Sequence, residues 1–135
     1  MVEKIKKRLG NLTGKKLGIL GLAFKSETDD MRESAAIIII NNLLAEGAII
    51  KVYDPKAMEN AKKIWGDKLT YSQDEYDTIL EVDGLIILTE WNQFRNLNLQ
   101  RIAELMAGKM FFDFRNIYKP GEVEAIGLVY EGIGQ

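Results

Sequence analysis

Two cations, Arg115 and Lys25, are the residues of this sequence best suited to binding a ligand. Arg115 directly follows the mostly apolar segment 110–114, which is typical of a buried strand. A guanidinium at the carboxyl end of a strand can hold a phosphate or carboxylate through two parallel hydrogen bonds. A structural ion pair with Asp113 or Asp29 is the alternative, and the residues alone leave both interpretations open.

Lys25 is the only cation in residues 21–31, and it stands just ahead of a predicted helix start. The dipole and the free N–H groups of a helix N-terminus attract anions, so a lysine there suits an anion site. Glu27, Asp29 and Asp30 would compete for both the cation and the helix end. Judged on these residues alone, a surface lysine in a polar loop is the favoured interpretation.

Three aromatic or acidic residues beside these loops also have two interpretations each. Phe24 is either a core residue or a flat wall for a ligand ring, and the core interpretation is favoured. Glu90 and Trp91 follow another predicted strand. They suit an interface or a ligand wall, although a tryptophan in a secondary core is the more common arrangement.

Two residue types that often carry chemistry are missing. The 135 residues include no cysteine and no histidine. Disulfides, thiolate metal sites and cysteine nucleophiles are therefore excluded, and the commonest general base and metal ligand is absent. An enzyme without either residue type is possible, but their absence argues against self-contained catalysis and against a metal site in this chain.

The charge balance and the hydropathy pattern exclude two classes of partner. A formal net charge of −2 argues against nucleic acid. Segment 2–9 contains four basic residues, and its apolar residues Val2, Ile5 and Leu9 recur at helical spacing. This pattern predicts an amphipathic helix with a solvated basic face. No apolar run approaches the roughly 18 residues that would span a bilayer, so no membrane partner is expected. The N-terminus has no signal-peptide pattern, and we expect a cytoplasmic protein.

Short apolar segments alternate with helix-like segments along the whole chain. We predict strands at 16–22, 48–53, 69–71, 84–89, 109–114 and 128–130, and helices at 2–9, 31–46, 56–65, 72–80, 97–106 and 120–126. Apolar strands alternating with helices indicate a parallel sheet that is covered on both faces. The predicted fold is α/β: a Rossmann-like, doubly wound, mostly parallel sheet of about six strands with helices on both faces, preceded by a short N-terminal helix.

Segment 31–46 is the ambiguous one because it contains four consecutive isoleucines, Ile37–Ile40, and isoleucine favours strands. Its flanks favour a helix. Thr28, Asp29 and Asp30 are candidate N-caps, and Gly47 stands where a helix-ending glycine belongs. We predict a helix that is buried on most sides. Segment 72–80 is predicted to be a short helix with a serine cap.

In such a sheet, ligands bind beyond the carboxyl ends of the strands. The loops at 21–30, 89–96 and 114–119 are therefore the candidate site. A dinucleotide fingerprint would need a glycine where Leu20 stands, and Asp54 lies about 33 residues beyond Gly21, against about 20 for a ribose-binding acid. Close packing of strand and helix explains Gly18 and Gly21 better than NAD binding does.

Four motifs in these loops resemble those of nucleotide-sugar 6-dehydrogenases. The longest is Gly21-Leu-Ala-Phe-Lys-Ser-Glu-Thr-Asp-Asp-Met-Arg-Glu-Ser34, which is similar to the family's Gly-x-x-Phe-Lys-x-x-x-x-Asp-x-Arg-Glu-Ser. The others are Val52-Tyr-Asp-Pro55, Leu88-Thr-Glu-Trp91 and Phe112-Asp-Phe-Arg-Asn116. The resemblance covers nearly the whole chain, and the third motif points to the UDP-glucose enzymes within the family.

The resemblance implies that the chain is the C-terminal, nucleotide-sugar-binding domain of a UDP-glucose 6-dehydrogenase. Such an enzyme oxidises the C6 alcohol of UDP-glucose to the carboxylate of UDP-glucuronate with NAD. An N-terminal NAD-binding domain and a central helical region would supply the cofactor site and the catalytic cysteine. By this resemblance, residues 1–13 are the tail of the central helix and 14–135 are the UDP-sugar-binding domain. The full enzyme is expected to be a homo-oligomer, and this chain alone is expected to be inactive and to bind no cofactor.

The family's nucleotide-sugar site carries over to Phe24, Lys25 and Arg115. Arg32, Glu33 and Ser34 match the family as well, but the chemistry of a helix start explains them. Phe114 stands where the family has glycine, and a bulky side chain is expected to crowd a site that the backbone normally approaches.

Three other functions are compatible with the sequence. The first is a stand-alone nucleotide-sugar-binding module without catalysis, and the second is a dehydrogenase of the same family that acts on another nucleotide sugar. A bare interaction domain, with no affinity for nucleotides, is the third and least specific possibility.

Overall fold

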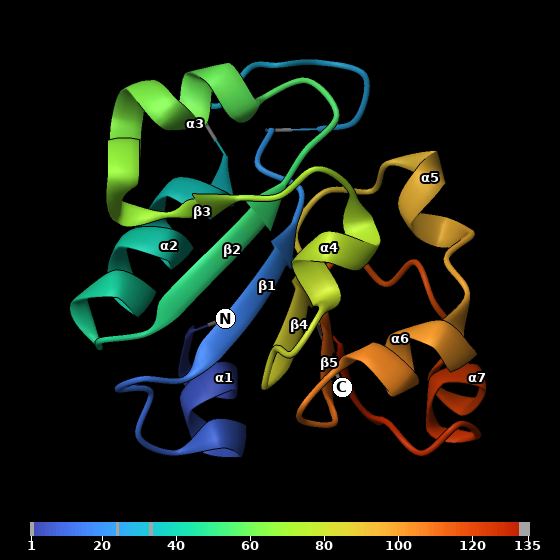
Figure 1. Ribbon diagram of the computed structural model, residues 1–135. Coiled ribbons are helices and arrows are strands. Elements are labelled where there is room, and N and C mark those ends of the chain that lie inside the picture. The colour runs from blue at the N-terminus through green and yellow to red at the C-terminus, as the bar shows by residue number, and fades with distance from the viewer. Residues whose placement is uncertain (1, 24, 33, 133–135) are drawn as a thin grey trace.

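The computed structural model describes residues 2–23, 25–32 and 34–132 (Figure 1). In these residues, six strands form one sheet with the order β3-β2-β1-β4-β5-β6, and each neighbouring pair is parallel. This order is that of the Rossmann fold, so the predicted α/β architecture is confirmed. The strands are β1 (Lys16–Leu20), β2 (Ile49–Tyr53), β3 (Thr70–Tyr71), β4 (Gly84–Ile87), β5 (Met110–Asp113) and β6 (Val129–Gly132).

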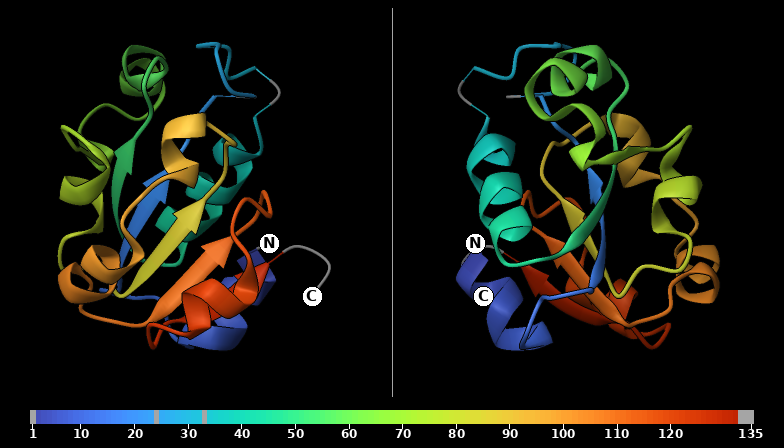
Figure 2. Two further views of the ribbon diagram at one scale, coloured as in Figure 1. Left: turned by 90° about the vertical axis from the view of Figure 1, so that its right-hand side faces the viewer. Right: turned by 60° about the vertical axis from the view of Figure 1, so that its left-hand side comes forward.

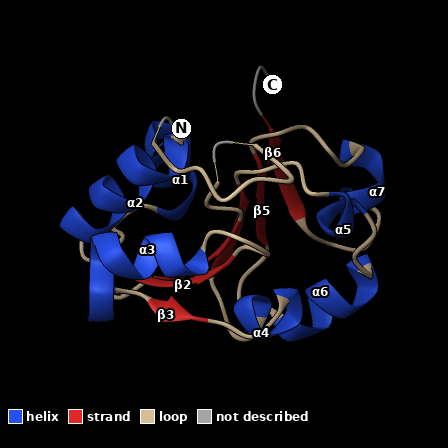
Figure 3. Ribbon diagram, turned by 90° about the horizontal axis from the view of Figure 1, so that it is seen from above, coloured by secondary structure: helices blue, strands red, loops and turns tan. Residues whose placement is uncertain are grey.

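Helices cover both faces of the sheet, as the view along the sheet in Figure 3 shows. One face is covered by α1 (Val2–Leu9), α2 (Ala35–Ala45) and α3 (Met58–Trp65), which a 3₁₀ turn, η1 (Gly66–Lys68), follows. The other face is covered by α4 (Glu75–Ile79), α5 (Asn92–Arg95), α6 (Leu99–Leu105) and α7 (Pro120–Glu124).

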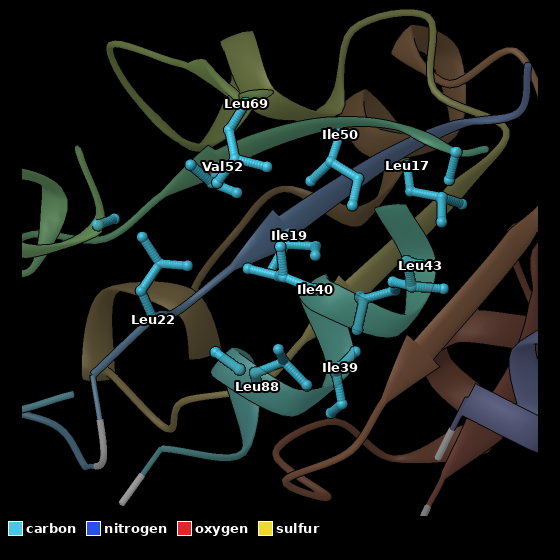
Figure 4. Packing of buried hydrophobic residues seen from close by; sticks show 14 of the residues in the cluster. Leu17, Ile19, Leu22, Ile39, Ile40, Leu43, Ile50, Val52, Leu69 and Leu88 are labelled. Carbon is cyan, nitrogen blue, oxygen red and sulfur yellow. The ribbon is translucent and has the colours of Figure 1, made fainter. Parts of the chain in front are cut away.

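The alternation of side chains along the strands divides the core into two clusters. Leu17 and Ile19 of β1 point to the side of α2, whereas Leu20 belongs to the cluster under α4 to α7. Figure 4 shows the first cluster, in which Ile39 and Ile40 of α2 pack against the sheet. The two central strands, β1 and β4, are thus apolar on both faces, because each face is covered by helices.

The four isoleucines are helical, as predicted from their flanks. Ile39 and Ile40 are buried, and Gly47 ends the helix with a φ of 88°, a conformation that glycine adopts without steric cost. Ile38 points outward and is 67% exposed, so the expectation of burial on most sides holds for only part of the helix.

The N-caps predicted for α2 and α4 were both wrong. The N-cap of α2 is Ser34, whose hydroxyl accepts a hydrogen bond from the N–H of Ala36, so the helix begins later than Thr28, Asp29 or Asp30 would have placed it. Asp74 caps α4 by accepting from the N–H of Asp77, whereas Ser72 is buried within the preceding loop. Several polar residues compete near each helix start, and tertiary contacts select among them.

The first helix and the last strand lie side by side, as both views in Figure 2 show. The ammonium of Lys4 donates to the carbonyl of Gly132 at 2.7 Å, and the guanidinium of Arg8 pairs with Glu131 at 3.1 Å. Ile5 is fully buried in the first core cluster. The helix is amphipathic as predicted, and its apolar face completes the core of the domain.

Candidate functional site

The loops that follow β1, β4 and β5 meet at the carboxyl edge of the sheet, toward which the arrowheads in Figure 1 point. Lys25 is exposed in the loop after β1. Arg115 follows β5 by two residues, and its side chain is 39% exposed. Phe24 lies outside the residues that the structure describes, and so does Glu33.

Glu90 is the acidic partner of Arg115. The Nε of Arg115 donates to Oε2 of Glu90 at 2.6 Å, and an Nη atom of the same guanidinium contacts the same oxygen. The sequence suggested Asp113 or Asp29 for this ion pair, which was wrong. Asp113 contacts Arg115 through its backbone: it accepts the backbone N–H of Arg115 at 3.3 Å. The side chain of Glu90 is 26% exposed, so the pair lies at the surface and is open to solvent.

The same carboxylate also contacts the loop after β1. Oε1 of Glu90 accepts the backbone N–H of Ser26 at 3.4 Å, and Ser26 adjoins Lys25. Burial tends to raise the pKa of Glu90, but hydrogen bonds from its own backbone N–H and from Arg115 outweigh burial and leave the pKa below its ordinary value. Glu90 therefore remains a carboxylate at neutral pH and joins the two loops that carry the predicted cations.

A hollow of about 330 Å³ opens beside Arg115. It is lined by Glu90, Arg95, Phe114, Arg115 and Asn116. Arg95 ends α5 and brings a second guanidinium to the hollow, which gives it two cations against one acid. Arg95 lies within the candidate loop 89–96, but no sequence signal marks it as a ligand residue, since nothing in the sequence shows that this short helix turns toward β5.

Phe114 stands where the resemblance predicts glycine. It is 4% exposed, and its ring lies 5.9 Å from that of Phe112 in the first core cluster. The side chain is therefore largely buried in the core, although Phe114 is also among the residues that line the hollow.

A larger hollow of about 670 Å³ lies between residues 29–32 and the helices α2 and α3. Neither Lys25 nor Arg115 lines it. Arg32, which does, donates to Asp30 from its backbone and its guanidinium, and these bonds hold the pKa of Asp30 at about 2. The exposed pair orders the approach to α2, in keeping with the structural interpretation of Arg32. The hollow beside Arg115 is the better candidate for an anion because its two arginines face one acid, whereas Arg32 and Lys63 of the larger hollow are balanced by Asp29 and Asp30.

Asp54, at the end of β2, is 1% exposed and is surrounded by N–H donors. Oδ2 accepts from the backbone of Leu22 and Ala23 and from the indole of Trp91, at 2.7 to 3.3 Å. Oδ1 accepts from the backbone of Lys56 and Ala57. Five donors occupy this carboxylate, so it organises the loops and is not available to a cofactor ribose.

The predicted close packing of strand and helix holds at Gly18, where a Cβ would lie 2.6 Å from the carbonyl oxygen of Thr78 in α4. Gly21 instead makes a close contact with the loop after β4. Its φ is 101°, and a Cβ at this position would lie 2.5 Å from Oγ1 of Thr89. Thr89 in turn donates to the carbonyl of Ala23 at 2.9 Å. Trp91 is buried in the second core cluster, which confirms the core interpretation of that residue.

Asp113 fixes the backbone of the loop that carries Arg115. Its carboxylate is buried and accepts from the N–H groups of Ile117 and Tyr118 and from the phenol of Tyr130. Burial, together with this bond to Asp113, raises the pKa of Tyr130. The backbone around Arg115 is therefore held independently of the ion pair with Glu90.

The described part of the chain contains no group of three or more acidic residues placed to hold a metal ion. Among the same residues, no helix is both long and apolar enough to cross a membrane. Arg115 and Arg95 make anion binding the chemistry that the hollow beside Arg115 supports, whereas Lys25 lines neither of the two hollows.

Comparison with known proteins identifies similar sequences and structures. The model of the UDP-glucose/GDP-mannose dehydrogenase family, UDP binding domain, matches residues 18–120. A UDP-glucose 6-dehydrogenase of Rhizobium meliloti is 43% identical over 126 residues, which cover 93% of this chain and 29% of that protein. A UDP-glucose 6-dehydrogenase of Rickettsia bellii is 41% identical over 99% of this chain and 31% of its own length.

Among solved structures, a UDP-glucose dehydrogenase from the archaeon Pyrobaculum islandicum is 38% identical and superposes with a TM-score of 0.81. The match covers 97% of this chain and 28% of that one. The present chain thus spans less than a third of the length of these relatives.

Proposed function

Since the chain belongs to the UDP-glucose/GDP-mannose dehydrogenase family as its UDP binding domain, we propose that it forms the nucleotide half of the substrate site in an NAD-dependent UDP-glucose 6-dehydrogenase. The full enzyme would oxidise UDP-glucose to UDP-glucuronate. Its remaining parts, an N-terminal NAD-binding domain and a central helical region, would lie outside this chain, and the enzyme would be a cytoplasmic homo-oligomer.

The observation that carries the proposal is the placement of Arg115. Arg115 follows β5 at its carboxyl end, lines the hollow together with Arg95, and forms an ion pair with Glu90. A diphosphate carries at least two negative charges and several acceptor oxygens, for which a planar guanidinium is the preferred partner. Lys25 is assigned to the same site because the loop that contains it contacts Glu90 through Ser26.

The NAD of the full enzyme does not fit the turn after β1. Leu20 is fully buried in the second core cluster at the position where a glycine would let the pyrophosphate approach. The first helix after this strand begins at Ala35, beyond a long loop, so its N-terminus does not directly follow the strand. We therefore assign the cofactor to another part of the full enzyme.

Calorimetric titration of this chain with UDP tests the proposal. Arg115→Ala removes charge-assisted hydrogen bonds worth about 1.5–3 kcal/mol, so the affinity should fall roughly tenfold or more. Arg115→Lys should restore part of it, since a point charge replaces a planar fork. Arg8→Ala is the matched control, because Arg8 is also half-exposed and paired with a glutamate, at the side of β6.

Unchanged UDP affinity in Arg115→Ala, or no UDP binding by the unaltered chain at millimolar concentration, would contradict the site assignment. The enzymatic part is tested separately, by the formation of NADH from UDP-glucose and NAD by the full-length gene product. A product that binds UDP-sugars and forms no NADH would favour the stand-alone binding module.

A further inference from the structure

The segment Leu88-Thr-Glu-Trp91, between β4 and α5, contacts the loops that follow three other strands. Thr89 donates to the carbonyl of Ala23 after β1, and Trp91 donates to Asp54 after β2. Glu90 accepts from Ser26 after β1 and from Arg115 after β5. The first two contacts are buried and hold the fold together, whereas Glu90 is the member that faces the hollow.

The geometry at Glu90 restricts how Arg115 can turn. Nε and one Nη of Arg115 both approach the same oxygen, Oε2, so the carboxylate holds the guanidinium along one edge. Two of the five N–H groups of an arginine are used in this way. Within the described part of the chain, the other three remain for a ligand, which is enough for a two-pronged contact with a phosphate.

The negative charge of Glu90 opposes the binding of an anion beside Arg115. A carboxylate beside an anion site repels the anion, and the pair is open enough to solvent to contribute little to folding stability. If Glu90 acted through its charge alone, its removal would strengthen the binding of a diphosphate. If it acts by orienting Arg115, its removal would weaken binding. The two roles therefore predict opposite signs.

We propose that Glu90 is a positioning residue that holds the Arg115 guanidinium and the backbone at Ser26 in one arrangement for a nucleoside diphosphate. This inference rests on the proposed function of the site. It assigns to the third of the four loop motifs a task that neither the fold nor the family match specifies. Asp113 fixes the backbone under Arg115, and Glu90 fixes the direction of its side chain.

The test is Glu90→Gln, which keeps the shape of the side chain and an acceptor for the N–H of Ser26 but removes the charge that holds Arg115. We expect UDP affinity to fall about tenfold, in a chain whose thermal unfolding is nearly unchanged. The matched control is Glu46→Gln. Glu46 is a surface glutamate paired with Lys6 at the end of α2, near the opposite edge of the sheet.

A double-mutant cycle separates positioning from general disturbance. In an Arg115→Ala background, Glu90→Gln should change UDP affinity by less than twofold, because the group that it positions is gone. An equal loss in both backgrounds would overturn the proposal. Tighter UDP binding by Glu90→Gln would also overturn it, and would show that the glutamate competes with the ligand for Arg115.

A second readout does not depend on UDP. In the unaltered chain, the Arg115 Nε–H should give a distinct, slowly exchanging nuclear magnetic resonance signal, which Glu90→Gln should return to the position of an exposed arginine. If this signal is unaffected by the substitution, Glu90 does not hold the guanidinium. If the signal responds as expected but the unaltered chain binds no UDP, the proposed function fails while the positioning of Arg115 stands.

Discussion

Replacing Asp54 by asparagine should be among the most destabilising conservative changes in this chain. The substitution keeps the size of the side chain but replaces one carboxylate oxygen by an NH₂ group. Oδ1 faces the N–H groups of Lys56 and Ala57, and Oδ2 faces those of Leu22, Ala23 and Trp91. Whichever way the amide turns, its NH₂ meets at least two N–H donors that have lost their acceptor.

The cost follows from these contacts. Each donor left without an acceptor in a buried position costs about 1–3 kcal/mol, so the less harmful orientation, with two such donors, loses about 2–6 kcal/mol of unfolding free energy. That is a large part of the stability of an ordinary domain. For a chain of this size, the melting temperature should fall by roughly 10 °C or more.

Urea unfolding followed by circular dichroism measures this loss, with a lower midpoint and an unchanged slope expected. Asp67→Asn is the control, since Asp67 is exposed in η1 and should tolerate the change. A free energy within about 0.5 kcal/mol of the parent chain for Asp54→Asn would refute the reasoning, because it would mean that the five contacts contribute nothing specific.

Three further outcomes are expected. Gly21→Ala should lower the free energy of unfolding by about 2 kcal/mol or more in urea titrations, since the new methyl would meet Thr89 at a positive φ; an unchanged midpoint would contradict this. Because the folded state raises the pKa of Tyr130, its stabilising effect is present below pH 10 and is lost as the pH rises further. Tyr130→Phe should therefore flatten the loss of stability between about pH 10 and 12, and an equally steep loss in this variant would refute the assignment. Calorimetry with NAD should show no saturable binding to this chain, because Leu20 occupies the position of the fingerprint glycine; tight binding would revive a cofactor role.

The sequence predicted the fold well because its information is local and periodic. Apolar strands, intervening helices and Gly47 were sufficient to resolve even the isoleucine run of α2. Helix starts were predicted less well. Ser34 was preferred over three earlier candidates because its hydroxyl both accepts from Ala36 and donates to the carbonyl of Leu22 at 2.7 Å. The second bond is tertiary, and a linear pattern does not contain it.

For the candidate site too, local features could be predicted from the sequence and tertiary contacts could not. Arg115 and Lys25 could be selected from the sequence because a general rule places ligands at the carboxyl ends of parallel strands. The partner of Arg115 could not, because Glu90 stands 25 residues away in the sequence, and Asp113 and Asp29 were the partners that the expected fold suggested. Arg95 was missed for a similar reason, since the orientation of a four-residue helix depends on what it packs against.

The pairing of the first helix with the last strand has a practical consequence for cutting this domain out of a longer polypeptide. A fragment limited to residues 18–120, the extent of the family match, would lack Ile5 and the whole of β6. Its sheet would end at β5 with an unpaired edge, and the phenol that bonds Asp113 beneath the Arg115 loop would be gone. Such a fragment should aggregate, and a loss of nucleotide binding in it would say nothing about the site itself.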